Sequence, residues 1–260
     1  ETIRPVQEQL MNDISTSLEQ KKNILAHAPT GLGKTASALS VALPFALKHE
    51  LTVFFLTNRH TQHQIAIQTL RDIKKKHGTD FVTVDIIGKK WMCAQEGVRE
   101  LYQQEFMEYC KAVREGGTCE FYENLYTKNS TLLSIGARRV RDDVVKKGAM
   151  HSDELKTASV LQRICPYYFA SELAKQATVV VGDYSLLFNP PVHNSFFSRA
   201  GKELGKSIII VDEAHNLADR IRASSSSKLS DAVVGYAVQE AAEFGLSSLG
   251  ERLRLLQRLV

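Results

Sequence analysis

The sequence predicts an α/β fold in which a parallel sheet is interrupted by a mainly helical insertion. Near both ends of the chain, short apolar runs rich in Val, Ile and Phe alternate with helical patterns, as a doubly wound sheet requires. Between residues 88 and 166 this alternation lapses, and polar, aromatic and cysteine-bearing residues take its place. Because strand patterns resume afterwards, we interpret the middle segment as an insertion into the sheet domain.

Apolar runs predict five buried, parallel strands, at residues 23–27, 51–57, 81–87, 178–181 and 207–211. The helix after the first run extends from Gly33 to about Lys48, and Pro44 inside it predicts a kink or an early end. A second helix, at 61–76, places its apolar residues on one face. The C-terminal part has a serine loop before two helical patterns, and the last of these reaches Val260 without a stop signal.

Composition is that of a globular chain, because 43% of its 260 residues are apolar and can form a core. The sequence has no uncharged apolar run of about 18 residues and no secretory pattern, so we expect an intracellular protein with no membrane partner. The net charge of +4 permits an anionic partner without requiring one. The basic runs at 74–76 and 138–141 are, on their own, typical of solvated faces.

The strongest motif is the glycine-rich loop Ala-Pro-Thr-Gly-Leu-Gly-Lys-Thr at 28–35, between a predicted strand and a predicted helix. Gly31 and Gly33 allow backbone N–H groups to turn toward phosphate oxygens at the start of that helix. Lys34 is placed to reach the β- and γ-phosphates, and the Thr35 hydroxyl suits Mg²⁺. The alternative is a chance glycine turn, which the strand–loop–helix context disfavours.

A second motif follows the last predicted strand and delivers two carboxylates at its carboxyl end, where open α/β sheets bind ligands. In the box Asp-Glu-Ala-His at 212–215, Asp212 suits a Mg²⁺ role and Glu213 can polarise the water that attacks the γ-phosphate. His215 is expected near the nucleotide. The alternative, two ordinary acids at a strand end, is disfavoured by the phosphate loop on the same chain.

The four cysteines lie inside or just at the end of the insertion, at Cys93, Cys110, Cys119 and Cys165. The gaps between them are 16, 8 and 45 residues, so no pair has the two-residue gap of a zinc knuckle. In an intracellular chain, cysteines favour metal ligation over disulfides. Thiolates suit either an iron–sulfur cluster or zinc, and buried core cysteines are the remaining alternative.

Together these motifs resemble a known class. The phosphate loop and the acid box at 212–215 look like motifs I and II of superfamily 2 helicases, and residues 54–62 resemble motif Ia. Residues 88–93, the next two cysteines and residues 164–167 look like the iron–sulfur domain of the XPD family, which includes the DinG branch. Residues 179–190 are similar to the segment that precedes motif II there, and the match covers about 1–220.

The resemblance implies a fold and a division of the chain. It implies a RecA-like P-loop domain in two parts, 1–87 and 167–218, with an iron–sulfur cluster domain at 88–166 and the beginning of a helical arch domain at 219–260. The four cysteines would hold a [4Fe–4S] cluster. ATP and Mg²⁺ would be the other cofactors.

The implied activity is that of an ATP-dependent 5′-to-3′ DNA helicase. A second motor domain with an arginine finger is expected in such enzymes and is not recognisable here, so we expect weak nucleotide binding and little unwinding from this chain alone. One alternative is a DinG-type helicase that acts on R-loops or with a nuclease partner. The other is a redox-responsive DNA-binding module whose nucleotide site is vestigial.

The resemblance also assigns candidate residues and partners. The nucleotide would contact Arg4, Gln7, Pro29, Thr30, Gly31, Leu32, Gly33, Lys34, Thr35, Ala36, Asp212 and Glu213, with Lys34, Asp212 and Glu213 as the catalytic groups. DNA would contact Asn58, Arg59, His60, Lys89, Lys90, Trp91, Arg163 and Tyr184. For Arg4 and Gln7 a plain surface role is the alternative, for residues 58–60 a capped helix start, and for Trp91 and Tyr184 packing.

The expected partners are single-stranded DNA, forked duplex DNA and the missing C-terminal motor half, with the chain itself a monomer. Its expected location is the cytoplasm, near the nucleoid, in a prokaryote or the nucleus in a eukaryote. Of these two, we favour a prokaryotic source.

Overall fold

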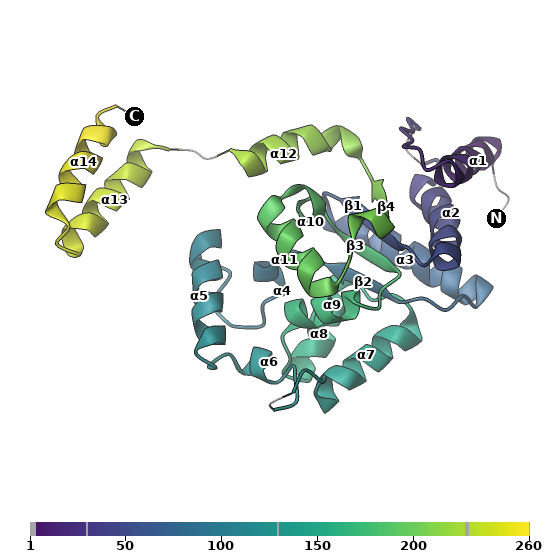
Figure 1. Cartoon of the computed structure of the whole chain (residues 1–260), viewed down its shortest axis with the longest axis horizontal. Coiled ribbons are helices and arrows are strands. Elements are labelled where there is room, and N and C mark those ends of the chain that lie inside the picture. The colour runs from purple at the N-terminus through teal and green to yellow at the C-terminus, as the bar shows by residue number, and fades with distance from the viewer. Residues whose placement is uncertain (1–3, 30, 129, 227–228, 260) are drawn as a thin grey trace. The chain divides into compact units, whose positions relative to one another are not determined.

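The computed structural model describes residues 4–29, 31–128, 130–226 and 229–259, which form two compact units, Glu1–Ala218 and Asp219–Val260 (Figure 1). The first unit is an α/β domain and the second is helical. The N-terminal helices are α1 (Pro5–Glu19), α2 (Lys34–His49) and α3 (His60–His77).

Four parallel strands form the sheet in the order β2-β3-β1-β4. Their bounds are Thr52–Thr57 for β1, Thr83–Ile86 for β2, Val179–Asp183 for β3 and Ser207–Val211 for β4. In β1 every residue is buried, because β3 and β4 pair with its two edges. The register sets Thr57 opposite Asp183 and Leu56 opposite Val211, so the carboxyl ends of these three strands lie side by side.

Side chains alternate between the two faces of the sheet, and each face has its own core. Val53 and Phe55 of β1 pack with α2 and α3, through residues such as Leu43 and Leu70. On the opposite face, Phe54 and other strand residues pack with helices from the middle of the chain. The sheet is therefore covered by helices on both sides, as the sequence predicts for a parallel sheet.

The predicted insertion is mainly helical. It contains α4 (Lys89–Met92), α5 (Gln103–Glu115), α6 (Glu120–Glu123), α7 (Ile135–Lys147) and α8 (Ser152–Leu161), and α9 (Pro166–Ala174) leads back into the sheet. Val140 and Val144 of α7, with Leu155 of α8, belong to the same core as the second sheet face. The insertion is thus part of the domain's core rather than an appended lobe.

Short elements complete the first unit and lead into the second. These are α10 (Ser185–Phe188), α11 (Pro190–Ala200) and the 3-10 turns at Leu204–Lys206 and Ala214–Asn216. The chain then forms α12 (Leu217–Ser225), which crosses the boundary between the units, and the hairpin of α13 (Asp231–Glu243) and α14 (Ser247–Gln257). Within that hairpin, the buried Gly250 of α14 faces the buried Ala241 of α13.

Three sequence expectations need correction. Residues 23–27 do not form a strand, and the Leu25 side chain is 91% exposed, because no described strand pairs with this segment. The strand β4 is half-buried rather than buried, since among the described residues only β1 pairs with it. Pro44 does not end its helix early: Leu39 and Ala46 are both buried in one core, so packing supports α2 on both sides of the proline.

Candidate functional site

The phosphate loop has the backbone geometry that its glycines predict. Gly31 and Gly33 adopt left-handed conformations, with φ of 82° and 84°, and α2 begins directly after Gly33. Leu32 is buried between them, whereas Pro29 is exposed. Thr30 lies outside the described residues. The loop is therefore shaped to turn backbone N–H groups toward an anion at the start of a helix.

The Lys34 ammonium folds back onto its own loop. Its Nζ donates a hydrogen bond to the carbonyl of Ala28 at 3.1 Å. Thr35 and Ala36 follow in the first turn of α2. A phosphate in the loop would give this ammonium a charged acceptor in place of a neutral carbonyl, which makes a stronger hydrogen bond.

Gln7 of α1 braces the same loop. Its Nε2 donates to the Leu32 carbonyl at 2.6 Å, and its Oε1 accepts from the Arg4 backbone N–H at 3.0 Å. Both ends of the amide are thus engaged by backbone. The structure brings Arg4, Gln7 and the phosphate loop together, as the predicted nucleotide set requires, with Gln7 touching the loop itself.

The acid box is held at the carboxyl end of β4. The backbone N–H of Asp212 donates to the Leu56 carbonyl at 2.8 Å, which extends the ladder with β1 by one residue. Glu213 then turns the chain with a left-handed φ of 52°, and its carboxylate lies 3.3 Å from Nδ1 of His215. The strand therefore presents two acids, Asp212 and Glu213, at the sheet edge.

Burial and the neighbouring Glu213 raise the pKa of Asp212, while a backbone hydrogen bond and the positive charge of Lys34 lower it in part. The helix α2, which begins at Lys34, contacts β4, so the phosphate loop and the acid box lie on neighbouring elements. A pair of close, partly buried carboxylates is an unfavourable arrangement that a bound cation would relieve.

The Tyr184 side chain contacts the backbone of the acid box. Only 4% of it is exposed, and its hydroxyl contacts the carbonyls of Asp212 and Glu213, the latter at 2.9 Å. The residue was predicted as a DNA contact, with packing as the alternative. The structure favours the alternative, because a buried hydroxyl that binds the strained Glu213 turn is turned away from solvent.

The four cysteines lie in or beside four helices that pack in one region: α4 contacts α5 and α9, and the Cys165 N–H donates to the Phe121 carbonyl of α6 at 2.7 Å. Cys93 follows α4, Cys110 lies in α5, and Cys119 and Cys165 precede α6 and α9. All four are free thiols, and burial raises the pKa of Cys165 to about 12, with a smaller contribution from the neighbouring Cys93 and Cys119. Four soft sulfur donors in one region fit a thiolate-bound metal group in their chemistry. Across the ranges that the structure describes, however, no three His, Cys, Asp or Glu side chains are arranged to hold a metal ion.

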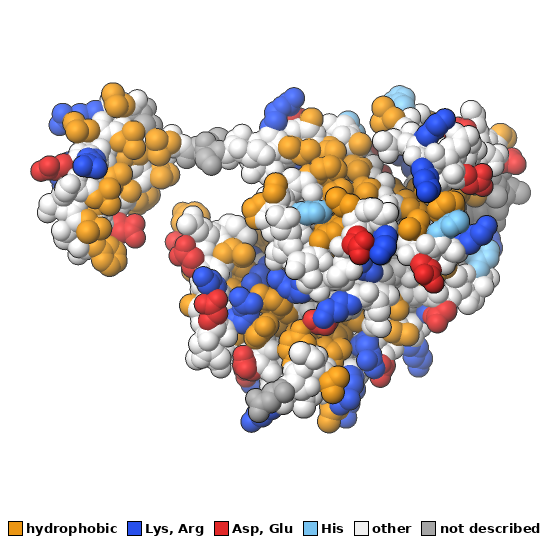
Figure 2. Space-filling view, in the orientation of Figure 1, with side chains coloured by type: hydrophobic (Ala, Val, Ile, Leu, Met, Phe, Trp, Pro, Cys, Tyr) orange, Lys and Arg blue, Asp and Glu red, His pale blue; other side chains and the backbone are white. Residues whose placement is uncertain are grey.

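A basic pocket lies beside the cysteines, between α4, α5, α9 and α11, with a volume of about 410 Å³. Lys89, Arg114 and Arg199 surround the ring of the buried Tyr168, at 4.9, 5.3 and 4.7 Å from its centroid. Tyr167 also lines it. Figure 2 shows blue Lys and Arg side chains gathered over this part of the molecule. Three cations around one aromatic ring form a site suited to an anionic ligand that also offers flat groups.

The other predicted DNA contacts have mixed surroundings. Arg59 and His60 are exposed at the start of α3, next to Asn58, and Trp91 is 54% exposed. The Lys90 ammonium binds the Leu101 carbonyl, and Arg163 pairs with Glu120 at 2.6 Å. Of the cations in this group, Lys89 alone lines the basic pocket.

Several residues that line the basic pocket were not predicted from the sequence. Lys111 and Arg114 come from α5, Tyr167 and Tyr168 from α9, and Arg199 from α11. No short motif joins them, because the pocket exists only after these helices pack. The Pro-Tyr-Tyr sequence after Cys165 was the one local signal that could have pointed to it.

Comparisons with known proteins agree with this geometry. Residues 55–234 match the DEAD_2 family. Among curated proteins, the "General transcription and DNA repair factor IIH helicase subunit XPD/RAD3" of Saccharomyces cerevisiae is 23% identical over 238 residues, which are 83% of this chain and 29% of that protein. A "Regulator of telomere elongation helicase 1 homolog" of Caenorhabditis briggsae is 23% identical over 266 residues, 88% of this chain and 25% of that protein.

A solved structure described as "Truncated XPD" aligns with a TM-score of 0.64 at 23% identity, over 96% of this chain and 65% of that one. The chain thus spans 29% or less of the two curated relatives, so the activities of those whole proteins remain proposals for it. Both relatives are eukaryotic and give no support to the predicted preference for a prokaryotic source. In the described part of the chain, no helix has the length and apolarity to cross a membrane.

The α/β fold expected from the sequence is confirmed. The acid box follows a strand and the phosphate loop precedes a helix, as predicted, but the strand predicted before the loop is absent from the described residues. The family match covers more than half of the residues. The chain belongs to the DEAD_2 family, and it is similar over most of its length to an XPD/RAD3 helicase subunit and to a truncated XPD structure.

Proposed function

We propose that this chain is part of an ATP-dependent 5′-to-3′ DNA helicase of the XPD type, in which ATP hydrolysis drives single-stranded DNA through the protein. The observation that carries the proposal is the placement of the two motifs on neighbouring elements: Lys34 begins α2, Asp212 and Glu213 follow β4, and α2 contacts β4. The basic pocket beside the insertion supports the DNA part of the proposal, since its cations suit phosphates and its tyrosines suit bases.

In the proposed reaction, the loop N–H groups and Lys34 bind the β- and γ-phosphates. Thr35 and Asp212 would hold Mg²⁺, which supplies charge neutralisation on the phosphates. Glu213 orients the attacking water and accepts its proton. Tyr184 keeps the Glu213 turn in its left-handed conformation, so the carboxylate stays at the sheet edge.

The domain roles follow from the same proposal. Residues 1–87 and 167–218 form the first helicase domain, 88–166 the cluster domain, and 219–260 the beginning of an arch. The start of α3, with Asn58, Arg59 and His60, contacts the DNA backbone, and the basic pocket binds the strand near the cysteines. A further motor domain would supply the arginine finger, so the isolated 260-residue chain should bind nucleotide weakly and unwind little.

Nucleotide binding by the isolated chain tests the carrying observation. A fluorescent ATP analogue with Mg²⁺ is titrated into the wild type, Lys34→Ala and Lys48→Ala, the last being an exposed lysine at the far end of the same helix. Lys34→Ala should weaken binding by tenfold or more, on the order of the charged hydrogen bonds that are lost. Lys48→Ala should bind as the wild type does. Equal affinities in all three proteins would contradict the proposal.

We further propose that the four cysteines hold a [4Fe–4S] cluster, on the basis of the packing of their helices in one region and their soft donor atoms. Protein purified without oxygen should be brown, absorb in the visible range and contain about four irons and four sulfides per chain. Cys110→Ser should lose that absorption. A colourless protein that contains zinc would contradict the cluster assignment.

A further inference from the structure

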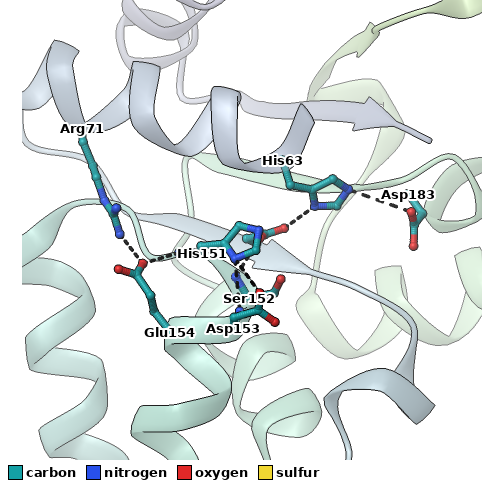
Figure 3. Close-up of polar contacts among 8 residues, drawn as sticks. His63, Arg71, His151, Ser152, Asp153, Glu154 and Asp183 are labelled. Atoms are coloured by element: carbon teal, nitrogen blue, oxygen red, sulfur yellow. Dashed lines mark hydrogen bonds and ion pairs between the residues drawn. The ribbon is translucent and has the colours of Figure 1, made fainter. Parts of the chain in front are cut away.

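A buried polar network lies outside the nucleotide and DNA residues already described (Figure 3). At its centre, Asp85 of β2 is fully buried, and its Oδ1 accepts a hydrogen bond from Nδ1 of His63 at 2.6 Å. Its other oxygen accepts from the backbone N–H of Ser152 at 2.8 Å. On the far side of the imidazole, Nε2 of His63 lies 3.9 Å from Asp183 at the end of β3.

These contacts give His63 two acidic neighbours, one on each ring nitrogen. Burial lowers the pKa of His63, but the hydrogen bond and charge of Asp85, together with the charge of Asp183, outweigh it and leave the pKa above its ordinary 6.5. A fully buried carboxylate such as Asp85 is costly unless it is paired. A protonated imidazole between the two acids provides that pairing.

The other charged groups that face the network come from α3 and the start of α8. His151 lies 3.6 Å from Asp85 through its Nε2 and 3.5 Å from Asp153 through its Nδ1. On α3, the rings of His60 and His63 are 5.6 Å apart, and Arg71 pairs with Glu154. The Arg71–Glu154 ion pair (Figure 3) is a direct link between α3 and α8. A second link runs from His63 through Asp85 to the backbone of Ser152. The start of α8 is thus tied to α3 at two places.

The network stands at a junction of three parts of the molecule. His63 is in the first turn of α3, directly after residues 58–62, where the proposed DNA contacts lie. Ser152 and His151 belong to the insertion, and Asp183 precedes Tyr184, which holds the acid-box turn. Because His63 and Asp85 are both fully buried, neither can reach DNA itself. Their effect on a ligand must pass through the backbone that they fix.

We propose that His63, bridging Asp85 and Asp183, is the positioning residue that holds the start of α3 at the carboxyl edge of the sheet, so that residues 58–60 meet the DNA backbone. The inference rests on the proposed DNA-binding role of that segment. On this proposal, His63 affects DNA affinity although it does not contact DNA.

A double-mutant cycle on the full 260-residue chain tests it, with a fluorescent single-stranded oligonucleotide as the probe. Arg59→Ala should weaken binding in the wild type. In His63→Asn, which keeps a donor toward Asp85 but not the second nitrogen, Arg59→Ala should have about threefold less effect or smaller still. His77→Asn, an exposed histidine on the last turn of α3, is the matched control and should leave the Arg59 effect unchanged. Additive losses in His63→Asn would overturn the inference.

The pH dependence of stability separates protonation from packing. A raised pKa means that His63 stabilises the fold fully below its unfolded value and loses that effect as pH rises through the folded value. The difference in unfolding free energy between wild type and His63→Asn should therefore shrink as the pH rises above about 6.5. A constant difference would show packing alone and overturn the role of the charge.

A second variant tests the inference without changing the two fully buried residues, His63 and Asp85. Asp183→Asn removes the outer charge, on a side chain that is 32% exposed, and leaves the buried His63–Asp85 hydrogen bond in place. It should reduce the Arg59 effect as His63→Asn does, and an unchanged effect would overturn the inference. Failure of the wild-type chain to bind the oligonucleotide at all would instead contradict the proposed function, so the two failures are distinguishable.

Discussion

The phosphate-loop segment and the acid-box segment carry the two halves of one proposed catalytic site, yet the structure holds them by different means. The acid box follows a strand that pairs in register with β1, and the Tyr184 hydroxyl fixes the turn after it. The phosphate loop follows residues 23–27, which pair with no described strand. It is held by Gln7 and by its own glycine conformations.

This difference shows that a motif's local shape and its anchoring are separate properties. The glycine conformations depend on a few neighbouring residues, so they form without a strand before them. A strand depends on a partner, because unpaired backbone groups gain nothing from an extended conformation in isolation. One half of the site is therefore fixed by tertiary pairing and the other by local chemistry.

The largest expected difference is between Phe54, in the strand that pairs with β4, and Leu25, in the segment before the phosphate loop. Phe54 is fully buried, and its ring stacks on Phe197 at 5.0 Å between centroids, so Phe54→Ala should lower the unfolding free energy by about 3–5 kcal/mol. Leu25 is 91% exposed, so Leu25→Ala should change it by less than about 0.5 kcal/mol. Urea denaturation measures both. A cost at Leu25 near that at Phe54 would mean that residues 23–27 are paired in solution, which would break the comparison.

The next effect concerns the phosphate loop, which Gln7 and its own glycine conformations hold in place. Gly33→Ala should cost about 1–2 kcal/mol for the left-handed backbone, and the added Cβ would lie 2.6 Å from Nε2 of Gln7. Gly201→Ala is a matched control, because Gly201 is also left-handed but has open space around its Cβ position. Thermal unfolding of both variants should show a larger loss at Gly33. If the two losses are equal, Gln7 does not brace the loop.

The smallest expected effect concerns the acid box, which strand pairing and Tyr184 hold in place. Tyr184→Phe keeps the ring in place but removes the hydroxyl from the Asp212 and Glu213 carbonyls, which should cost about 0.5–1.5 kcal/mol. Nucleotide affinity should also fall, because the Glu213 turn relaxes. Tyr102→Phe, at a residue that is 80% exposed, should change neither quantity. A Tyr184→Phe protein with unchanged stability and affinity would show that the strand alone fixes the acid box.

Local sequence predicted the features that a few adjacent residues determine. The four strands of the sheet, the helix after the phosphate loop and the helical nature of the insertion are confirmed. The Ile-rich run 207–211 did become a strand, but its half-burial depended on what covers its outer edge, which no local pattern encodes. The exposure of Leu25 has the same origin.

The candidate site divides in the same way. The loop glycines and the two acids could be recognised because each motif is contiguous in sequence. The pocket around Tyr168 and the His63–Asp85 pair could not, since their members come from different helices and strands and meet only through tertiary packing. A buried aspartate inside an apolar strand, Asp85, was the one irregularity that could have prompted a search for its partner.

The strand order has a consequence for how the chain is made. The two neighbours of β1 in the sheet, β3 and β4, both follow the whole insertion in sequence. During synthesis, the apolar residues of β1 therefore leave the ribosome long before either edge can be paired. Such long-range pairing is slow, and exposed strand edges favour aggregation while it is pending. The nascent protein should depend on chaperones that shield β1 until β4 has emerged.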